Sequence, residues 1–210
     1  MKIVSLGLSI IVILFISGCQ NEERLNPKDS SYFPLHVGDS WLYKPANELY
    51  PDMNAFIPTV SREIIGTSFI DGDEYFLVVI TSYYPDSKTQ TDSTYYRVDP
   101  STEFVYEYKK QIPELQLNPF RLSANLGDRW HYSFQSTEDD MALNLISTVD
   151  LNGSSIENCK RFYYDVALMA DEEHYTVLAP NLGIVSLGNA WGFDLKLQKA
   201  TINGQTFQFF

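Results

Sequence analysis

The chain has 210 residues, of which 44% are hydrophobic and 14% aromatic, and its formal net charge is −12. This composition is too apolar for a disordered chain and too acidic for a nucleic-acid-binding protein, which needs a basic surface. Two cysteines are too few for a disulfide-stabilised scaffold, and the length suits one domain or two small ones.

The first nineteen residues predict a lipoprotein signal peptide. Lys2 supplies the positive start, residues 3–16 form an apolar run, and Ile16-Ser17-Gly18-Cys19 follows. The run is too short for a membrane-spanning helix, which needs about 20 residues. The last four residues resemble the lipobox of bacterial lipoproteins, which implies cleavage of residues 1–18 and diacylation of the Cys19 thiol. The alternatives are a plain signal peptide with an incidental cysteine and an uncleaved anchor.

Residues 19–31 are polar and contain Pro27, so they predict a flexible tether behind the lipidated cysteine. The lipid must hold the chain at the membrane, because an acidic domain is repelled by anionic lipid. Gln20 stands where inner-membrane lipoproteins of enteric bacteria carry Asp, which favours the outer membrane. Glu22-Glu23 resembles an acidic signal for surface exposure, and both the periplasmic face and the cell surface stay open as destinations.

Residues 32–210 predict a mainly β domain. Aromatic and β-branched residues cluster in short runs with turn residues between them. The clearest runs are Glu74–Tyr84, Ser93–Asp99, Phe104–Tyr108 and Phe193–Ile202. Three dipeptides that tolerate positive φ mark tight hairpins, namely Asp71-Gly72, Asn152-Gly153 and Asn203-Gly204. We expect an antiparallel meander or half-barrel, or else a sandwich. The best helical candidates, Ala46–Phe56 and Gln135–Leu145, are weak.

Two parts of the chain are similar to each other. Residues 37–43 (VGDSWLY) match residues 126–132 (LGDRWHY), and weaker matches follow in the same order. These matches predict two similar β-rich halves, over 35–112 and 124–190, with a C-terminal hairpin over 192–210. The alternative is coincidence between stretches of similar composition. One of the weaker matches aligns Gly66 with Gly153. In that alignment the Asp71-Gly72 turn has no hairpin turn at the corresponding position of the second half.

The start of the β domain resembles a group of bacterial lipoproteins of unknown function. Residues 32–43 read YFPLHVGDSWLY shortly after the lipobox, and the mature domain of that group begins Y-F-P-L-x-x-G-x-x-W-x-Y. Residues 178–185 (LAPNLGIV) are similar to a later pattern of the group. The resemblance implies a lipoprotein domain and carries over no catalytic residue.

The sequence predicts no catalytic residue, no metal site and no cofactor. His36, His131 and His174 lack zinc-ligand spacing. The acidic runs 71–74 and 171–174 lie beside turns, and neighbouring strand residues point to opposite faces, so neither run converges on an ion. Cys159 has no motif partner and is expected to be a small buried residue. We therefore expect that the protein is not an enzyme.

Adjacent tyrosines, such as Tyr83-Tyr84 and Tyr95-Tyr96, should place about half of these rings on a solvent or cavity face. Exposed aromatic rings on a sheet can bind sugars or peptides, whereas cross-strand tyrosine pairs simply stabilise the sheet. The aromatic content therefore leaves both a binding surface and a purely structural role open.

The expected function is that of an outer-membrane lipoprotein whose β domain binds or scaffolds, without catalysis, an envelope protein, a glycan or a lipid. A first alternative is a carrier of lipid or another hydrophobic ligand, which predicts an apolar cavity of several hundred Å³. A second alternative is a hydrolase of envelope polymers, which predicts paired carboxylates or a His–Asp contact in a cleft.

Replacing Cys19 tests the anchor. In cells fed radiolabelled palmitate, we expect the wild-type chain to be labelled and to fractionate with the outer membrane. The Cys19→Ala variant should lose all label, because the acylated thiol is gone. Cys159→Ala is the matched control and should keep the label. Label that persists in Cys19→Ala would contradict the lipobox interpretation.

Overall fold

The computed structural model describes residues 29–46, 51–112, 116–166 and 169–209, so the predicted signal peptide and Cys19 lie outside the described residues. Two short 3-10 turns occur, η1 (Asp29–Tyr32) and η2 (Pro51–Ala55). The first six strands are β1 (Ser40–Pro45), β2 (Thr59–Ile70), β3 (Asp73–Tyr83), β4 (Thr89–Val98), β5 (Phe104–Tyr108) and β6 (Gln116–Arg121). The others are β7 (Arg129–Trp130), β8 (Met141–Leu151), β9 (Ser154–Tyr164), β10 (His174–Ala179), β11 (Gly183–Asn189), β12 (Asp194–Ile202) and β13 (Gln205–Gln208).

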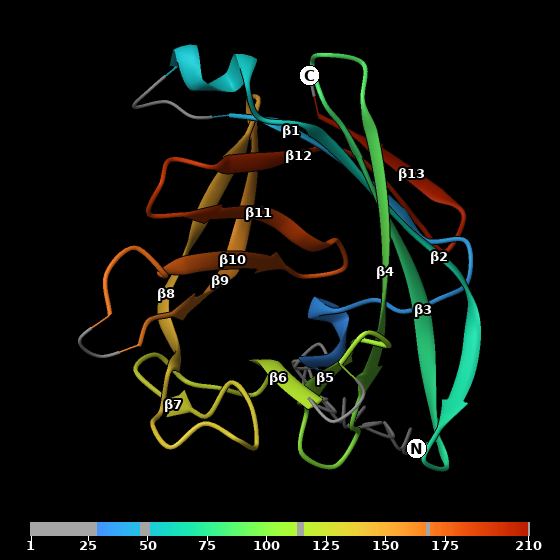
Figure 1. Cartoon of the computed structure of the whole chain (residues 1–210), viewed down its shortest axis with the longest axis vertical. Coiled ribbons are helices and arrows are strands. Elements are labelled where there is room, and N and C mark those ends of the chain that lie inside the picture. Colours follow the sequence, from blue (N-terminus) through green and yellow to red (C-terminus); the bar gives the residue numbers. More distant parts are fainter. Residues whose placement is uncertain (1–28, 47–50, 113–115, 167–168, 210) are drawn as a thin grey trace, which may run out of the picture.

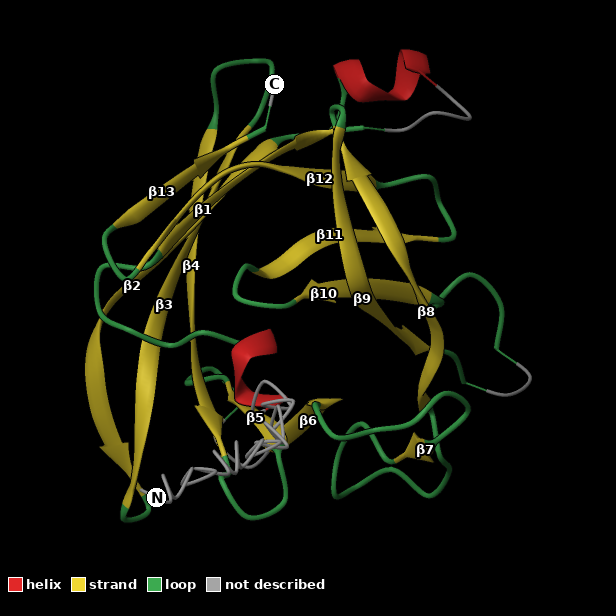
Figure 2. Cartoon of the chain, turned by 180° about the vertical axis from the view of Figure 1, so that it is seen from behind, coloured by secondary structure: helices red, strands yellow, loops and turns green. Residues whose placement is uncertain are grey.

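The thirteen described strands form a single antiparallel sheet, which confirms the prediction of a mainly β meander; the sandwich alternative is not found. The strand order is β6-β5-β4-β3-β2-β1-β12-β11-β10-β9-β8-β7, with β13 added beside β12. Strands β2 to β4 form one wall and β8 to β11 the other, and the sheet curves between them (Figures 1 and 2). A single bridge from Leu117 to Ser133 links the region of β6 to the chain after β7.

The three predicted hairpin turns are confirmed. They connect β2 to β3, β8 to β9 and β12 to β13, and all six of their residues have φ between 51° and 91°. Positive φ at both positions matches the right-handed twist of the flanking strands, which is why Asn-Gly and Asp-Gly favour such turns. The helical candidate Gln135–Leu145 is wrong, because it forms a loop followed by the start of β8 at Met141.

β-Bulges adjust which residues face the core. In β12 the partner of Leu42 is Lys199 and the partner of Tyr43 is Leu197, so one extra residue lies between them. Leu195 and Leu197 are buried before this bulge, and Ala200 and Ile202 are buried after it. A strict period of two cannot bury both pairs, so the bulge keeps both ends of a long strand packed on a curved core.

The two runs of six strands are built alike, over β1 to β6 and β7 to β12. The amide of Gly38 donates to the carbonyl of Ile64 at 2.8 Å, and that of Gly127 donates to Leu143 at 2.8 Å. Both glycines have positive φ, 96° and 93°. When the two runs are compared strand by strand, the β2–β3 turn is equivalent to the β8–β9 turn. The sequence match of Gly66 with Gly153 is therefore out of register and must be shifted. These likenesses support the predicted duplication, which stays a prediction.

The N-terminal segment 29–35, here called the strap, lies between the two walls (Figure 1). The Tyr32 hydroxyl donates to the carbonyl of Asn158 at 2.7 Å, and the Asn181 amide donates to Ser31 at 2.8 Å. On the other side, the Phe33 ring contacts the Tyr96 ring with centroids 5.3 Å apart. The strap thus joins both halves, and the described chain is already fixed to the sheet at η1.

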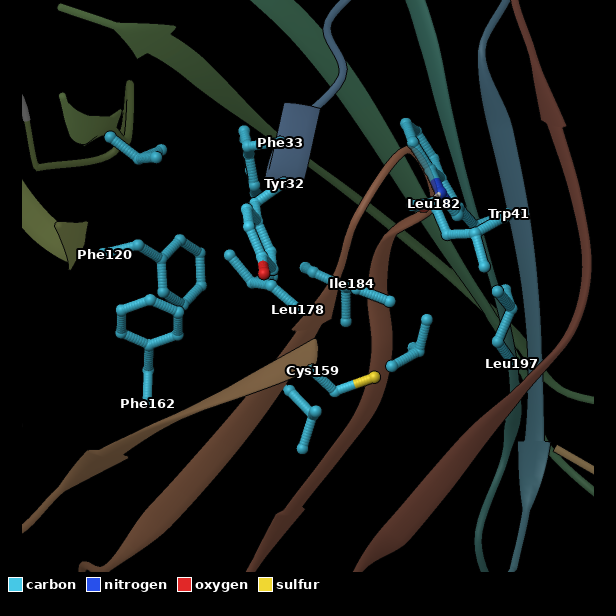
Figure 3. Packing of buried hydrophobic residues seen from close by; sticks show 14 of the residues in the cluster. Tyr32, Phe33, Trp41, Phe120, Cys159, Phe162, Leu178, Leu182, Ile184 and Leu197 are labelled. Atoms are coloured by element: carbon cyan, nitrogen blue, oxygen red, sulfur yellow. Dashed lines mark hydrogen bonds between the residues drawn. The ribbon is translucent and has the colours of Figure 1, made fainter. Parts of the chain in front are cut away.

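The core lies inside the curve of the sheet and contains side chains from both halves (Figure 3). Trp41 donates its indole N–H to the carbonyl of Leu182 at 2.6 Å, and Tyr43 donates its hydroxyl to Ile184 at 3.0 Å. The rings of Phe120 and Phe162 meet edge to face with centroids 5.2 Å apart. Trp41 and Tyr43 of β1 are both buried, and both use their polar atoms on the opposite half.

Two glycines in the sheet should respond to alanine with opposite signs. A Cβ at Gly188 would lie 2.7 Å from both the carbonyl oxygen of Phe193 and the Tyr175 ring, whereas a Cβ at Gly66 meets nothing within 4 Å. We expect Gly188→Ala to lower the free energy of unfolding by about 1–3 kcal/mol through overpacking. Gly66→Ala should raise it by about 0.4–1 kcal/mol, because the unfolded chain loses freedom. Urea unfolding measures both, and equal losses would contradict the described packing.

Candidate functional site

A cavity of about 250 Å³, here called the central cavity, lies between the two halves of the sheet. Its volume is just below the range of roughly 300–1,000 Å³ that is usual for small-molecule sites. The first half contributes Arg62, Ile80, Asp92, Ser93, Thr94, Tyr96, Glu107, Lys109, Pro119 and Phe120 to its lining. The second half contributes Tyr132, Met141, Phe162, His174, Thr176 and Ile184. Charged and aromatic side chains thus line one partly open cavity.

A buried carboxylate, Glu107, stands on the β5 side of the central cavity. The Thr94 hydroxyl donates to its Oε1 at 3.0 Å, and Lys109 Nζ lies 3.7 Å from the same oxygen. Burial and the adjacent Glu107 carboxylate raise the pKa of Tyr96 well above its ordinary value. Tyr96 therefore keeps its proton at neutral pH and can donate a hydrogen bond. The Glu107 charge is already compensated within the protein.

Arg62 of β2 also lines the central cavity, and among the residues that the structure describes no carboxylate lies within ion-pair distance of its guanidinium. Its Cζ lies 5.9 Å from the centroid of the Tyr43 ring, which is a cation–π contact. Its Nε is buried, and in the part of the chain that the structure describes this atom has no hydrogen-bond acceptor. Buried donors are normally satisfied. The Nε atoms of Arg97 and Arg121 also lack an acceptor among the described residues. These two guanidiniums have carboxylate partners in Asp73 and Asp128, whereas Arg62 has none within the described residues.

An aromatic group closes the β8–β10 side of the central cavity. The Tyr132 and Tyr164 rings meet with centroids 5.0 Å apart, and the His174 ring stacks on Tyr164 at 4.6 Å. Burial lowers the pKa of His174, and the charge of Lys109 lowers it further, despite an opposing contact with the carbonyl of Glu172. His174 therefore favours its neutral form near neutral pH.

A smaller apolar pocket of about 20 Å³ adjoins the central cavity and shares Arg62, Tyr96 and Ile184 with it. The strap forms part of its wall through Phe33, Pro34 and Leu35. Gly183 has φ of 77° and lies against Pro34 and Trp41, where a Cβ would come within 3.3 Å of Pro34. A glycine here lets the strap and the β10–β11 turn approach each other closely.

The structure disperses most of the side chains considered in the sequence. Of the three histidines only His174 lines the central cavity, while His36 and His131 lie near Asp39 and Asp139 at 3.2 and 3.6 Å. Within the described ranges, no group of three or more His, Cys, Asp or Glu residues is placed to hold a metal ion.

Cys159 is a free buried thiol, as predicted for a small core residue. Burial raises its pKa to about 11, so it is a neutral thiol at physiological pH. A reactive cysteine requires the thiolate form, so this environment is that of an inert core residue.

Cross-strand aromatic pairing accounts for several of the tyrosines. The Tyr108 ring meets Tyr95 and Tyr75 with centroids 6.0 and 6.3 Å apart, and the Arg97 guanidinium lies 4.8 Å from the Tyr106 centroid. Such contacts between neighbouring strands stabilise a sheet. Two other tyrosines, Tyr96 of β4 and Tyr132 in the bend after β7, line the central cavity.

Sequence reasoning missed Arg62 and Glu107, although their strands carry a signal. Arg62 alternates with the buried Val60 and Ile64, and Glu107 shares its face of β5 with the buried Val105. A charged residue in an inward position of an alternating strand is a candidate for a functional site.

The helices in the described part of the chain are both single 3-10 turns, which lack the length and apolarity needed to cross a bilayer.

Two solved structures share this fold. One is described as an exported protein with a YmcC-like fold from Bacteroides fragilis NCTC 9343, with a TM-score of 0.50 and 11% sequence identity. The other is described as a lipoprotein from Parabacteroides distasonis ATCC 8503, with a TM-score of 0.50 and 10% identity. Each match covers 84% of this chain and 98% of the other. Identities this low establish a common fold alone. No family model matches the chain, and no curated protein is similar to it.

The buried histidine predicts a pH dependence of stability. The pKa of His174 is lowered in the folded state, so the unfolded chain binds more protons around and below the ordinary value of about 6.5. The unfolding free energy should therefore fall as the pH is lowered from about 7.5 to about 5.5. Urea unfolding of His174→Asn should show a shallower fall. His131→Asn, outside the cavity, is the control for loss of a histidine, and an unchanged slope in His174→Asn would contradict this assignment.

Proposed function

We propose that this protein is an exported lipoprotein, anchored in the outer membrane through Cys19, whose β domain binds a small ligand in the central cavity without catalysis. The anchor is supported by the lipobox and by the polar residues between Cys19 and the strap. The two structural neighbours are described as an exported protein and a lipoprotein, which agrees with export.

The mixed lining of the central cavity is the observation that carries the binding proposal. A cavity needed only for packing would be small and apolar, because buried polar groups without partners destabilise the fold. This one instead gathers Arg62, Glu107, Tyr96 and His174 from separate strands around about 250 Å³. A few polar groups among apolar side chains are typical of small-molecule sites.

The polar lining favours a small ligand over a carried lipid. A lipid carrier needs a long apolar cavity, because each acyl CH₂ gains about 0.8 kcal/mol only when it leaves water for an apolar contact. Here charged groups from β2 and β5 face the cavity. The adjoining apolar pocket, at about 20 Å³, is too small for an acyl chain. A lipid or a whole envelope protein as the ligand is therefore less favoured than a small polar molecule.

The arrangement of titratable groups favours binding over hydrolysis. The buried carboxylate Glu107 is engaged by Thr94 and lies near Lys109, whereas a general acid or base needs free access to a substrate. The ring of His174 contacts a backbone carbonyl, that of Glu172, and the His–Asp contacts of His36 and His131 involve residues that do not line the central cavity. Asp92, the second carboxylate of the lining, is exposed and accepts from Gln111 Nε2 at 3.2 Å, so both carboxylates of the described cavity already have partners.

A cavity-filling variant tests this function. The full mature chain is extracted from its own membrane, denatured, and analysed by mass spectrometry for small molecules that co-purify. We expect one compound with the wild type and none with Thr176→Phe, because the new ring occupies the central cavity. Thr91→Phe, which adds the same ring at an exposed position of β4, should keep the compound. Retention by Thr176→Phe, or no compound from any variant, would overturn the proposal.

A further inference from the structure

We propose that the ligand of the central cavity carries an anionic group, a carboxylate or a phosphate, that binds the guanidinium of Arg62. This inference rests on the proposed function, because it names the class of ligand for the same cavity. It follows from the position of Arg62, from the charges around it and from the rest of the lining.

The fold directs the half-buried Arg62 toward the inner face of the sheet. Residues two apart on a strand share a face, so the buried Val60 and Ile64 direct Arg62 inward. Its guanidinium lies 5.9 Å from the Tyr43 ring centroid, and the hydroxyl of Tyr43 is fixed on the carbonyl of Ile184 at 3.0 Å. The cation is therefore positioned before any ligand arrives, which lowers the entropy lost on binding.

The charged side chains near Arg62 have partners of opposite charge, whereas Arg62 has none within the described residues. Lys109 lies beside Glu107, and on β4 Arg97 pairs with Asp73 at 3.2 Å. Asp92, the other carboxylate of the lining, is exposed and accepts from Gln111 Nε2 at 3.2 Å. Arg62 has no ion pair within the described residues, and its buried Nε has no acceptor. An anionic group of the ligand would supply both the charge partner and the hydrogen-bond acceptor that Arg62 lacks.

The geometry of the guanidinium group limits which anions can bind to it well. Its planar array of N–H donors matches two oxygens of one carboxylate or phosphate, which gives two parallel hydrogen bonds. The contact with Tyr43 is made to the ring, and no ion pair within the described residues uses the guanidinium donors, so they are left for such an anion. The Tyr96 hydroxyl lies in the same lining, but the Glu107 carboxylate is already its hydrogen-bond partner, so the anionic group is assigned to Arg62.

The remaining lining describes the rest of the ligand. Phe120, Phe162 and Ile184 present apolar surface to the central cavity, so an apolar or ring-shaped part fits beside the anionic group. The volume of about 250 Å³ limits the ligand to a small molecule. The net charge of −12 disfavours a polyanion, because repulsion would act along its whole length outside the cavity.

Binding of small aromatic probes tests the inference. The full mature chain in non-ionic detergent is titrated with 4-fluorobenzoate, 4-fluorophenyl phosphate and the neutral isostere 4-fluorobenzamide, followed by ¹⁹F NMR. We expect at least one anion to bind the wild type about ten-fold or more tightly than the amide. If 4-fluorobenzoate binds more tightly than 4-fluorophenyl phosphate, the site is one for a carboxylate; the reverse order indicates a phosphate site. No binding of either anion, or equal binding of the amide, would overturn the inference.

Variants at two arginines locate the effect. Arg62→Gln should weaken anion binding about ten-fold or more. Arg62→Lys keeps the charge but loses the planar array of donors, so its affinity should lie between those of the wild type and Arg62→Gln. Arg97→Gln is the matched control, since Arg97 also lies over tyrosine rings on a strand but does not line the cavity. Unchanged affinity in Arg62→Gln would overturn the assignment. If Arg62→Gln does not fold, the assignment is tested by the affinity of Arg62→Lys for the anions. The comparison of the anionic probes with the amide on the wild type is a second test.

The two proposals fail in different ways. A neutral or cationic compound that co-purifies with the wild type and with Arg62→Gln, but not with Thr176→Phe, would keep the binding function and refute the anion. An anionic compound that is lost from both Thr176→Phe and Arg62→Gln supports both proposals. A compound retained by Thr176→Phe would refute the cavity as its site.

Discussion

The pairing of β1 with β12 is the contact on which the rest of the structure depends. Six residues of β1 pair along β12, from Ser40 with Thr201 to Pro45 with Leu195. On either side of this seam the chain forms runs of sequential antiparallel strands, which local turns alone could produce. The seam is the strand pairing that makes them one sheet, beside the isolated bridge from Leu117 to Ser133. Trp41 and Tyr43 reinforce the seam by donating to backbone carbonyls of the β10–β11 region.

The central cavity is a product of this seam. Arg62 and Glu107 belong to the first run of strands, whereas His174 and Phe162 belong to the second. These side chains face one space only because the curved sheet brings the walls opposite each other. The strap adds a further constraint, since Tyr32 contacts one half and Phe33 the other. The site therefore depends on the relative position of the halves, and small shifts between them would change its shape.

Local signals in the sequence predicted much of the fold and little of the site. Phe104–Tyr108 forms β5 with the predicted bounds, and the three hairpin turns follow from residues that tolerate positive φ. Such features depend on near neighbours. The bulges, the seam and the aligned turns depend on contacts between distant residues, so periodicity could not place them. Arg62 is visible as a charge in an inward position, but its lack of a partner is a property of the folded chain alone.

The seam also has a consequence for how the chain folds. Its two strands lie near opposite ends of the sequence, so a long loop must close before β1 gains its second neighbour. Sheets with such distant pairings fold slowly compared with helical bundles of similar size. For a chain that leaves the cytoplasm as proposed, slow closure is an advantage. The sheet cannot be completed until β12 is available to pair with β1, so on the proposed export route the unclosed chain would still be able to pass through a narrow channel.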